Sequence, residues 1–141
     1  MSFFTSLRIS GSGLRAERLR ADLAAANLAN ANSTRAPEGG PYRRRDPVLR
    51  TVASGGAFGS ELERALGSVE VRRVVLDPRP SRQIFNPSHP DADENGMVSL
   101  PNVQVVEEIT NLTNAARSYQ ANIAAIGVSR EMAERALRMG R

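Results

Sequence analysis

Apolar and polar positions in the last third of the chain follow a regular helical pattern. Steps of four and three residues join Val105, Ile109, Leu112, Ala116, Tyr119, Ile123, Ile126, Arg130, Ala133 and Leu137 without a break. All but one are apolar or aromatic, which is the a/d pattern of a coiled-coil helix. Arg130 is the exception, and its aliphatic stem can lie along the stripe while its guanidinium reaches water. The alternative is that close packing ends near Ile126.

Residues that favour helix ends bound this pattern. Asn102 follows a proline and is a candidate N-terminal cap. Gly140 follows the last apolar position, as is common at a helix C-terminus. Glu131–Arg135 and Glu134–Arg138 are opposite charges four residues apart, in the favourable order. The sequence therefore predicts a helix over 102–139.

The first part of the chain carries a second helical pattern. Apolar residues at seven-residue spacing, widened by further leucines, form a stripe of Leu7, Leu14, Leu19, Ala21, Leu23 and Leu28. The stretch 21–31 is rich in alanine, which favours helix. Pro37 and two glycines then break the pattern, so a helix is predicted from about Phe4 to Ala31. Neither helix is expected to be stable alone, and the two are predicted to pair.

The middle of the chain has a different character, because all eight prolines lie between 37 and 101. Alternating apolar residues predict one strand over about 69–76 and shorter strands at 84–85 and 97–100. The segment 55–68, which contains ELERAL, could hold one or two helical turns. The predicted fold class is mainly α with a small β module, in which the terminal helices pair as a coiled coil around a central segment rich in β-hairpins.

A length of 141 residues fits one main domain with three parts. Residues 1–36 and 102–141 supply the helices of a helical core, and residues 37–101 form the β-rich module. No stretch is apolar over the ~20 residues that a membrane span needs. The N-terminus lacks the charged and apolar regions of a secretory signal, so a cleaved signal peptide is not expected.

Charge and residue usage narrow the function classes. All 19 basic residues are arginine, the net charge is +4, and the chain has no cysteine. The missing thiols exclude disulfides, cysteine-bound zinc and a cysteine nucleophile. Arg43, Arg44 and Arg45 form the one basic cluster, and they could contact an anionic partner. Elsewhere acids lie among the arginines, which argues against a nucleic-acid-binding face.

The stretch PDADENGMVSLP resembles half of a calcium loop. Asp91, Asp93, Asn95 and Gly96 match its first positions, but Asn102 stands where a bidentate Glu is needed, and prolines flank the run. The alternative is a hairpin turn. His89 is the single histidine and cannot build a usual zinc site. No set of residues supports catalysis, and neither a metal nor a cofactor is expected.

Both ends of the chain carry a recognisable signature. SGLRAERLRADLAAANLANANSTR, at 12–35, resembles the N-terminal motif of the bacterial flagellar rod, hook and hook-associated axial proteins, in which S-G-L opens a helix that ends in N-x-A-N-x-x-T. Asn27, Ala29 and Asn30 match, while Ser33 stands in place of the Thr. PEGGPYRRRD, HPDADENGMVSLPNVQVVEE and ARSYQANIAAI are similar to the proximal-rod members of this family. The region 47–68 matches least.

The resemblance implies a structural rod subunit, without enzymatic activity, that polymerises through its terminal helices in the basal body. It implies export by the flagellar type III apparatus to the periplasmic rod, without a cleaved signal. The implied partners are other copies, other rod proteins, the adaptor at the export gate and MS ring, and possible nearby peptidoglycan. The predicted assembly residues are the apolar stripe residues of both helices with Asn27 and Asn30, and Arg43–Arg45 are an outer contact. The alternative is an autonomous helical and β module that binds an anionic polymer.

Overall fold

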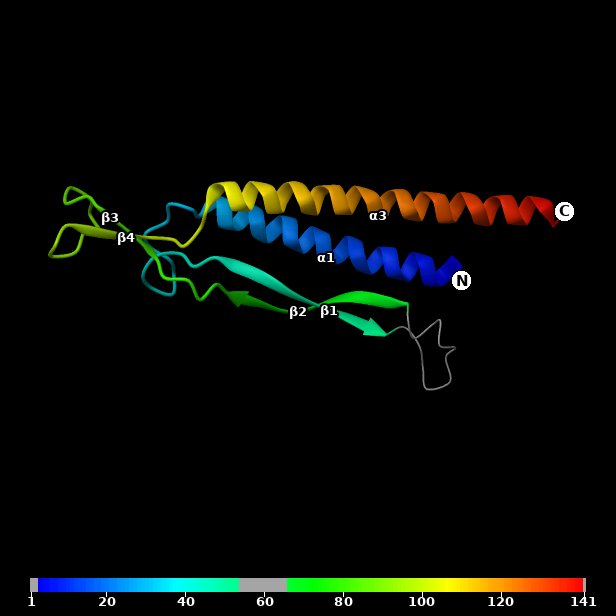
Figure 1. Cartoon of the computed structure of the whole chain (residues 1–141), viewed down its shortest axis with the longest axis horizontal. Helices are drawn as coiled ribbons and strands as arrows, with labels where there is room; N and C mark the ends of the chain where they lie inside the picture. The colour runs from blue at the N-terminus through cyan, green and yellow to red at the C-terminus, as the bar shows by residue number, and fades with distance from the viewer. Residues whose placement is uncertain (1–2, 54–65, 141) are drawn as a thin grey trace.

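The computed structural model describes residues 3–53 and 66–140, and within them the chain is an elongated molecule of two long helices and two small sheets. Helix α1 spans Phe3–Ala29 and helix α3 spans Val105–Met139. Strands β1 (Arg45–Ala53) and β2 (Gly67–Leu76) form one antiparallel sheet, and β3 (Arg82–Phe85) and β4 (Met97–Leu100) form another. In Figure 1, α1 lies between α3 and the β1–β2 ribbon.

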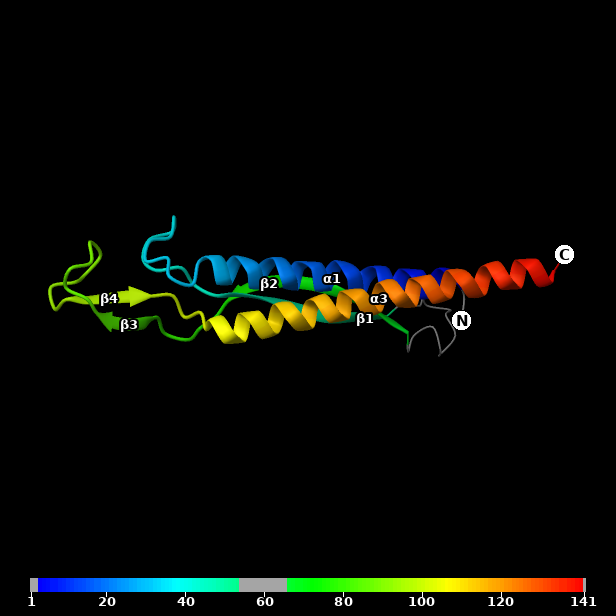
Figure 2. The ribbon, with the colours of Figure 1, turned by 90° about the horizontal axis from the view of Figure 1, so that it is seen from above.

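The two helices lie side by side, and they run antiparallel, a direction that the sequence patterns did not specify. Helix α3 extends past the N-terminus of α1, which both views show (Figures 1 and 2). The side chain of Asn122 on α3 lies close to the backbone of α1 at Gly13, where a Cβ atom would be 2.8 Å from Asn122 Oδ1. Small residues of α1, including Ser12, Ala16 and Ala24, are buried. Helix α1 thus uses small side chains rather than large apolar ones to approach its neighbours.

The line of α3 that is most covered differs from the predicted stripe. Ala115 and Glu108 are fully buried, and seven-residue steps from them reach the half-buried Asn122 and Ser129. Three of the ten predicted stripe positions are partly covered, namely Leu112, Ile126 and Ala133. The other seven stay exposed, namely Val105, Ile109, Ala116, Tyr119, Ile123, Arg130 and Leu137. At every second position, the covered residue of α3 is therefore the one before the predicted stripe residue, such as Ala115 in place of Ala116. The reason is that polar and small residues of α3 meet the small residues of α1.

Of the four strands in the described part of the chain, three were predicted and one was missed. The predicted segments 69–76, 84–85 and 97–100 correspond to β2, β3 and β4. Strand β1 was not predicted, because Pro47 and charged residues interrupt its apolar alternation. Its register with β2 shifts between Val48 and Leu49, where β2 carries one extra residue. ELERAL lies almost wholly outside the described residues.

The helix ends agree with the sequence at one terminus and not at the other. Gly140 caps the C-terminus of α3, as predicted. The N-cap is Gln104, so the predicted cap at Asn102 is wrong, and the side chain of Asn102 contacts other segments instead. Arg135 pairs with Glu131 at 2.5 Å, as predicted. Glu134 pairs with Arg130 at 2.8 Å, rather than with Arg138.

The β3–β4 loop is a turn whose carboxylates bind the protein itself. Asp93 Oδ1 accepts hydrogen bonds from the backbone N–H groups of Asn95 (2.9 Å) and Met97 (2.8 Å). Gly96 has φ +73°, a conformation that glycine adopts without strain. Asp91 pairs with Arg35 and accepts a hydrogen bond from Thr34 at 2.7 Å. These contacts tie the hairpin loop to the segment that follows α1.

Candidate functional site: a buried polar junction

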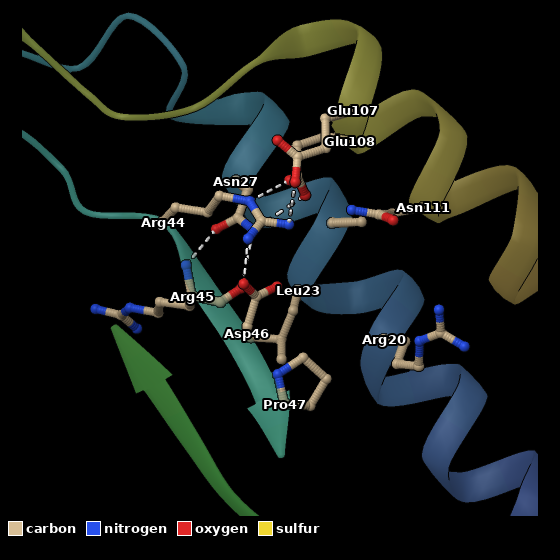
Figure 3. Close-up of a pocket in the computed structure, with 11 residues that line it drawn as sticks. Arg20, Leu23, Asn27, Arg44, Arg45, Asp46, Pro47, Glu107, Glu108 and Asn111 are labelled. Carbon is tan, nitrogen blue, oxygen red and sulfur yellow. Dashed lines mark hydrogen bonds and ion pairs between the residues drawn. The ribbon is translucent and has the colours of Figure 1, made fainter. Parts of the chain in front are cut away.

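A buried arginine lies where the helices, the ribbon and the segment before α3 meet (Figure 3). Arg44 is only 5% exposed, and its guanidinium contacts four carboxylates. Its Nε lies 2.6 Å from Glu108 Oε1, its Nη1 lies 3.2 Å from Asp77 Oδ2 and also pairs with Asp46, and its Nη2 lies 3.3 Å from Glu107 Oε1. Since a buried charge is costly unless it is paired, the network depends on each of these partners.

Asn27, near the C-terminus of α1, joins the same junction. Its Nδ2 donates to Glu108 Oε2 and to the carbonyl of Arg45, both at 3.0 Å. Its Oδ1 accepts from the Tyr42 hydroxyl at 2.9 Å and from the backbone N–H of Arg45 at 3.0 Å. The amide thus uses both donors and both lone pairs of its side chain, which explains why it can be buried.

Asn102 and Arg79 complete the junction on the side of the second hairpin. Asn102 Oδ1 accepts from the backbone N–H of Arg44 at 2.9 Å, and its Nδ2 donates to the carbonyl of Arg79 at 3.0 Å. Arg79 Nε donates to Asp77 Oδ2 at 2.8 Å. This hydrogen bond is the main reason that the pKa of Asp77 falls to about 2. Burial raises the pKa of Asp46, while Arg44 opposes that effect.

The junction fixes four segments of the chain to one another: the end of α1, the start of β1, the end of β2 and the start of α3. A cavity of about 340 Å³ lies beside it, lined by Leu23, Pro47 and Asn111 among others. The carboxylates around it are engaged with arginines. The arrangement is suited to holding the helices and the β module at a fixed angle.

Two family profiles match the chain. The family described as "Flagella basal body rod protein" matches residues 7–36, which hold most of α1 and the loop after it. The family described as "Flagellar basal body rod FlgEFG protein C-terminal" matches residues 94–139, which hold β4 and α3. These are the two ends of the chain that carry the sequence signature.

Relatives that match over nearly the whole chain show the family to which it belongs. The flagellar basal-body rod protein FlgC of Salmonella typhimurium is 39% identical over 140 residues, which cover 99% of each chain. FlgC of Yersinia enterocolitica is 36% identical with the same coverage, and FlgC of Bacillus subtilis is 34% identical over 152 residues and 100% of each chain. The chain belongs to the FlgC family of flagellar basal-body rod proteins.

In this FlgC-family chain, the two asparagines of the N-terminal motif have different surroundings. Asn27 is buried in the junction, whereas Asn30 Nδ2 donates to the carbonyl of Ala26 at 2.9 Å and its Oδ1 accepts from the Ser33 hydroxyl at 3.1 Å. Asn30 therefore shapes the turn after α1.

The sequence did not point to Glu108 and Asp77 as site residues. Their partner Arg44 is distant in sequence, and a pair of this kind leaves no local pattern.

The basic cluster is split by the fold. Arg44 is buried among carboxylates and cannot form the predicted outer contact, so that part of the prediction is wrong. Arg43 and Arg45 are exposed, and Arg45 lies over the Tyr42 ring at 5.7 Å. The alternative of an anionic-polymer module loses one of the three cations on which it rested.

The exposed positions of the α3 stripe form a row of mostly apolar side chains along the helix. Ile109 and Ile123 are each 49% exposed, and Leu137 is 74% exposed. The stripe leucines of α1, namely Leu7, Leu14, Leu19, Leu23 and Leu28, are half-buried. Scattered exposed apolar residues are ordinary, but a row along one face marks a surface suited to a partner.

Residues 3–53 and 66–140 contain neither a candidate metal site nor a membrane-spanning helix. No group of three or more His, Asp or Glu residues there is placed to hold a metal ion. His89 Nδ1 accepts a hydrogen bond from the backbone N–H of Asp91 at 3.1 Å. Neither of the helices in that part of the chain is long and apolar enough to cross a bilayer.

Proposed function

We propose that this FlgC-family chain polymerises into the flagellar basal-body rod through its terminal helices. The chain is a structural rod subunit rather than an enzyme, as its full-length relatives are rod proteins. The observation that carries the proposed mode of assembly is the exposed part of the α3 stripe, seven of its ten positions, which α1 leaves uncovered. Full burial of a large apolar side chain contributes about 1.5–3 kcal/mol, so neighbouring subunits would gain by covering Ile109, Ile123 and Leu137.

The α1–α3 pair supports assembly in a second way. Its interface is built from small and polar residues, with Ala16 and Ala115 among the few that are fully buried. Such a pair contributes little apolar burial by itself, and helices gain most of their stability from packing. We therefore propose that the parts of the terminal helices beyond the junction become fully ordered only on assembly, as coupled folding would keep the free subunit from polymerising in solution.

Contact between one face of a subunit and a different face of the next gives an open helical assembly, as a rod requires. The junction around Arg44 would then hold the β module at a fixed angle to the packed helices. The neighbours in this proposal are other copies of the chain and other rod proteins, and the chain would reach the periplasmic rod through the flagellar type III export apparatus for motility. Arg43 and Arg45 remain proposed outer contacts, and peptidoglycan is a possible neighbour.

The test replaces one exposed stripe residue. Ile123→Asp places a charge on the face proposed for assembly, and we expect loss of swimming with normal export of the subunit. Asn114→Asp is the matched control, because residue 114 is exposed and lies on the opposite face of the same helix, about two and a half turns from residue 123. Normal swimming of the Ile123→Asp strain would contradict the proposed assembly face. Basal bodies from a strain without this gene should lack an intact rod in electron micrographs, and intact rods would refute the function itself.

Coupled folding has a separate test on the purified chain. We expect circular dichroism at low concentration to show less helix than α1 and α3 together would give. A full helical signal with a cooperative thermal transition would contradict ordering on assembly, while leaving the rod assignment in place.

A further inference from the structure

The β1–β2 ribbon carries more positive charge than its own carboxylates neutralise. Six arginines and three acids lie in residues 43–53 and 67–77. Asp46 and Asp77 are taken by the buried Arg44, and Glu70 pairs with Arg50 at 2.7 Å. The remaining cations are Arg43, Arg45, Arg72 and Arg73. Of these, Arg45 has a long pair of 3.5 Å with the exposed Glu38.

The bulge in the ribbon gathers two of these cations. Val48 is opposite Arg73 and Leu49 is opposite Val71, so Arg72 is the extra residue on β2. Arg72 and Arg73 are consecutive, yet both are exposed. Neither forms an ion pair within the described residues of the chain. A bulge redirects side chains and bends the strand that carries it, and here it holds two consecutive exposed arginines without an ion pair among the described residues.

A largely apolar recess lies beside Arg43 and Arg45, at the part of β2 that follows the bulge. This cavity of about 340 Å³ is lined by Tyr42, Val74 and Leu76 with the two arginines, and by Glu38, the partner of Arg45. Val74 is 44% exposed and Leu76 is 52% exposed, although both belong to a strand. The ribbon lies on the side of α1 away from α3, so this surface does not coincide with the exposed stripe of α3 (Figure 1).

We propose that the outer ribbon surface, defined as Arg43, Arg45, Arg72, Arg73, Val74 and Leu76, docks an acidic protein segment that carries an apolar side chain. Carboxylates of the segment pair with the arginines, three of which have no ion pair among the described residues, namely Arg43, Arg72 and Arg73. Guanidinium groups bind carboxylates in a two-pronged geometry that favours such pairing. The apolar side chain enters the recess beside Val74 and Leu76. A polysaccharide or a lipid headgroup would satisfy the charge but would leave the recess unfilled.

The α3 stripe of a second subunit does not suit this surface, so the occupant is a segment of another protein. The exposed stripe residues Ile109, Ile123 and Leu137 are apolar without adjacent unpaired carboxylates, since Glu131 and Glu134 pair with arginines of the same helix. Charge complementarity therefore points to a partner with its own acidic surface. The proposal goes beyond assembly through the helices, and it assigns a role to a surface that the helices leave free.

The experiment uses a photo-cross-linking amino acid in the full chain within assembled basal bodies. Placed at Val74, it should cross-link to a segment of another protein in which acidic residues flank an apolar one, identified by mass spectrometry. Placed at Ile123, it reports contacts of the α3 stripe and so tests the proposed assembly face separately. Absence of the chain from basal bodies would defeat the proposed function, whereas its presence without an acidic cross-linked segment at Val74 would overturn only this inference.

Charge-reversal variants test whether the cross-link from Val74 depends on the arginines. Arg72→Glu with Arg73→Glu should lower the cross-link yield from Val74 by roughly tenfold, because like charges replace attractive pairs. Arg72→Lys with Arg73→Lys should retain most of the yield. Arg18→Glu is the matched control on α1, where the arginine is 78% exposed in its side chain, and it should leave the yield unchanged. Equal yields from the reversed and unreversed chains would overturn the proposal.

Other classes of partner are distinguished with purified chain. Sedimentation with peptidoglycan sacculi and with phosphatidylglycerol vesicles should show no binding that depends on Arg72 and Arg73. Binding of either probe that is lost on charge reversal would replace the acidic protein by that anionic surface and overturn the proposal. The charge-reversed variant could instead self-associate while its cross-link from Val74 stays unchanged. That result would show that the arginines only keep the strand edge from pairing with another chain, and it would also overturn the proposal.

Discussion

Replacement of Arg44 by methionine is the most informative perturbation of the junction. Methionine keeps much of the aliphatic length of the side chain but removes its charge and donors. Glu108, which is 1% exposed, then loses the Nε contact of 2.6 Å. Asp46 and Glu107 also lose their contacts with the guanidinium, while Asp77 keeps its pair with Arg79. Removing one partner of a buried ion pair costs about 3–5 kcal/mol, since an uncompensated charge stays buried.

A loss of this size is easily measured. Small domains have unfolding free energies of about 5–15 kcal/mol. This free energy falls by about 1–3 kcal/mol for each 1 M increase in urea concentration. The Arg44→Met variant should therefore unfold at a urea concentration lower by about 1.5–2.5 M if the slope is about 2 kcal/mol per molar. Arg73→Met is the matched control, because Arg73 is exposed and has no ion pair within the described residues. It should change stability by no more than about 0.5 kcal/mol.

The double variant Arg44→Met with Glu108→Leu separates the two causes of destabilisation. If the cost comes from the charge left behind on Glu108, removing that charge should recover part of the stability. Equal urea midpoints for the Arg44→Met and Arg73→Met chains would refute the reasoning. So would a double variant that is less stable than expected from the two single changes added together.

Two further predictions concern helix packing and pH. Gly11→Ala should stabilise the packed helices of the assembled subunit by about 0.5–1 kcal/mol, as nothing lies within 4 Å of the new Cβ atom. Gly13→Ala should gain less, because Asn122 must move. Equal gains in the urea concentration that takes assembled rods apart would contradict the close approach. Since the pKa of Asp77 is lowered to about 2, its contribution to stability is present above its ordinary pKa and is lost as pH falls toward 2. The urea midpoint of Asp77→Asn should therefore fall less between pH 5 and pH 2.5 than that of the unchanged chain, with Asp22→Asn as the control, and parallel losses would argue against the lowered pKa.

The junction explains why a short motif near the end of α1 is connected to residues far along the chain. Asn27 binds Glu108, which is 81 residues away, and Arg44 binds the same carboxylate across 64 residues. These contacts place the end of α1, the ribbon and the start of α3 in one arrangement. For a rod subunit, this would fix the angle between the packed helices and the outward-facing β module.

Sequence patterns alone predicted the two helices, the end of α3 at Gly140 and three of the four strands. Each of these depends on neighbouring residues: a seven-residue repeat, a glycine after a helix, or alternation along a short strand. The turn before Met97 was predicted for the same reason, because Asp93 and Gly96 act within a few residues of each other. Local rules of this kind need no knowledge of what packs on the chain.

Only the tertiary structure decided which face of α3 meets α1, that β1 forms, and that Arg44 is buried. An apolar stripe shows where a helix can pack, but Ala115 and Asn122 were selected as neighbours by the small residues of α1. Strand β1 contains a proline and gains its hydrogen bonds from β2, which follows it by more than a dozen residues. Arg44 lies in a run of three arginines with no local difference among them. Its burial follows from carboxylates that only the folded chain brings within reach, because a charge leaves water only where such partners surround it.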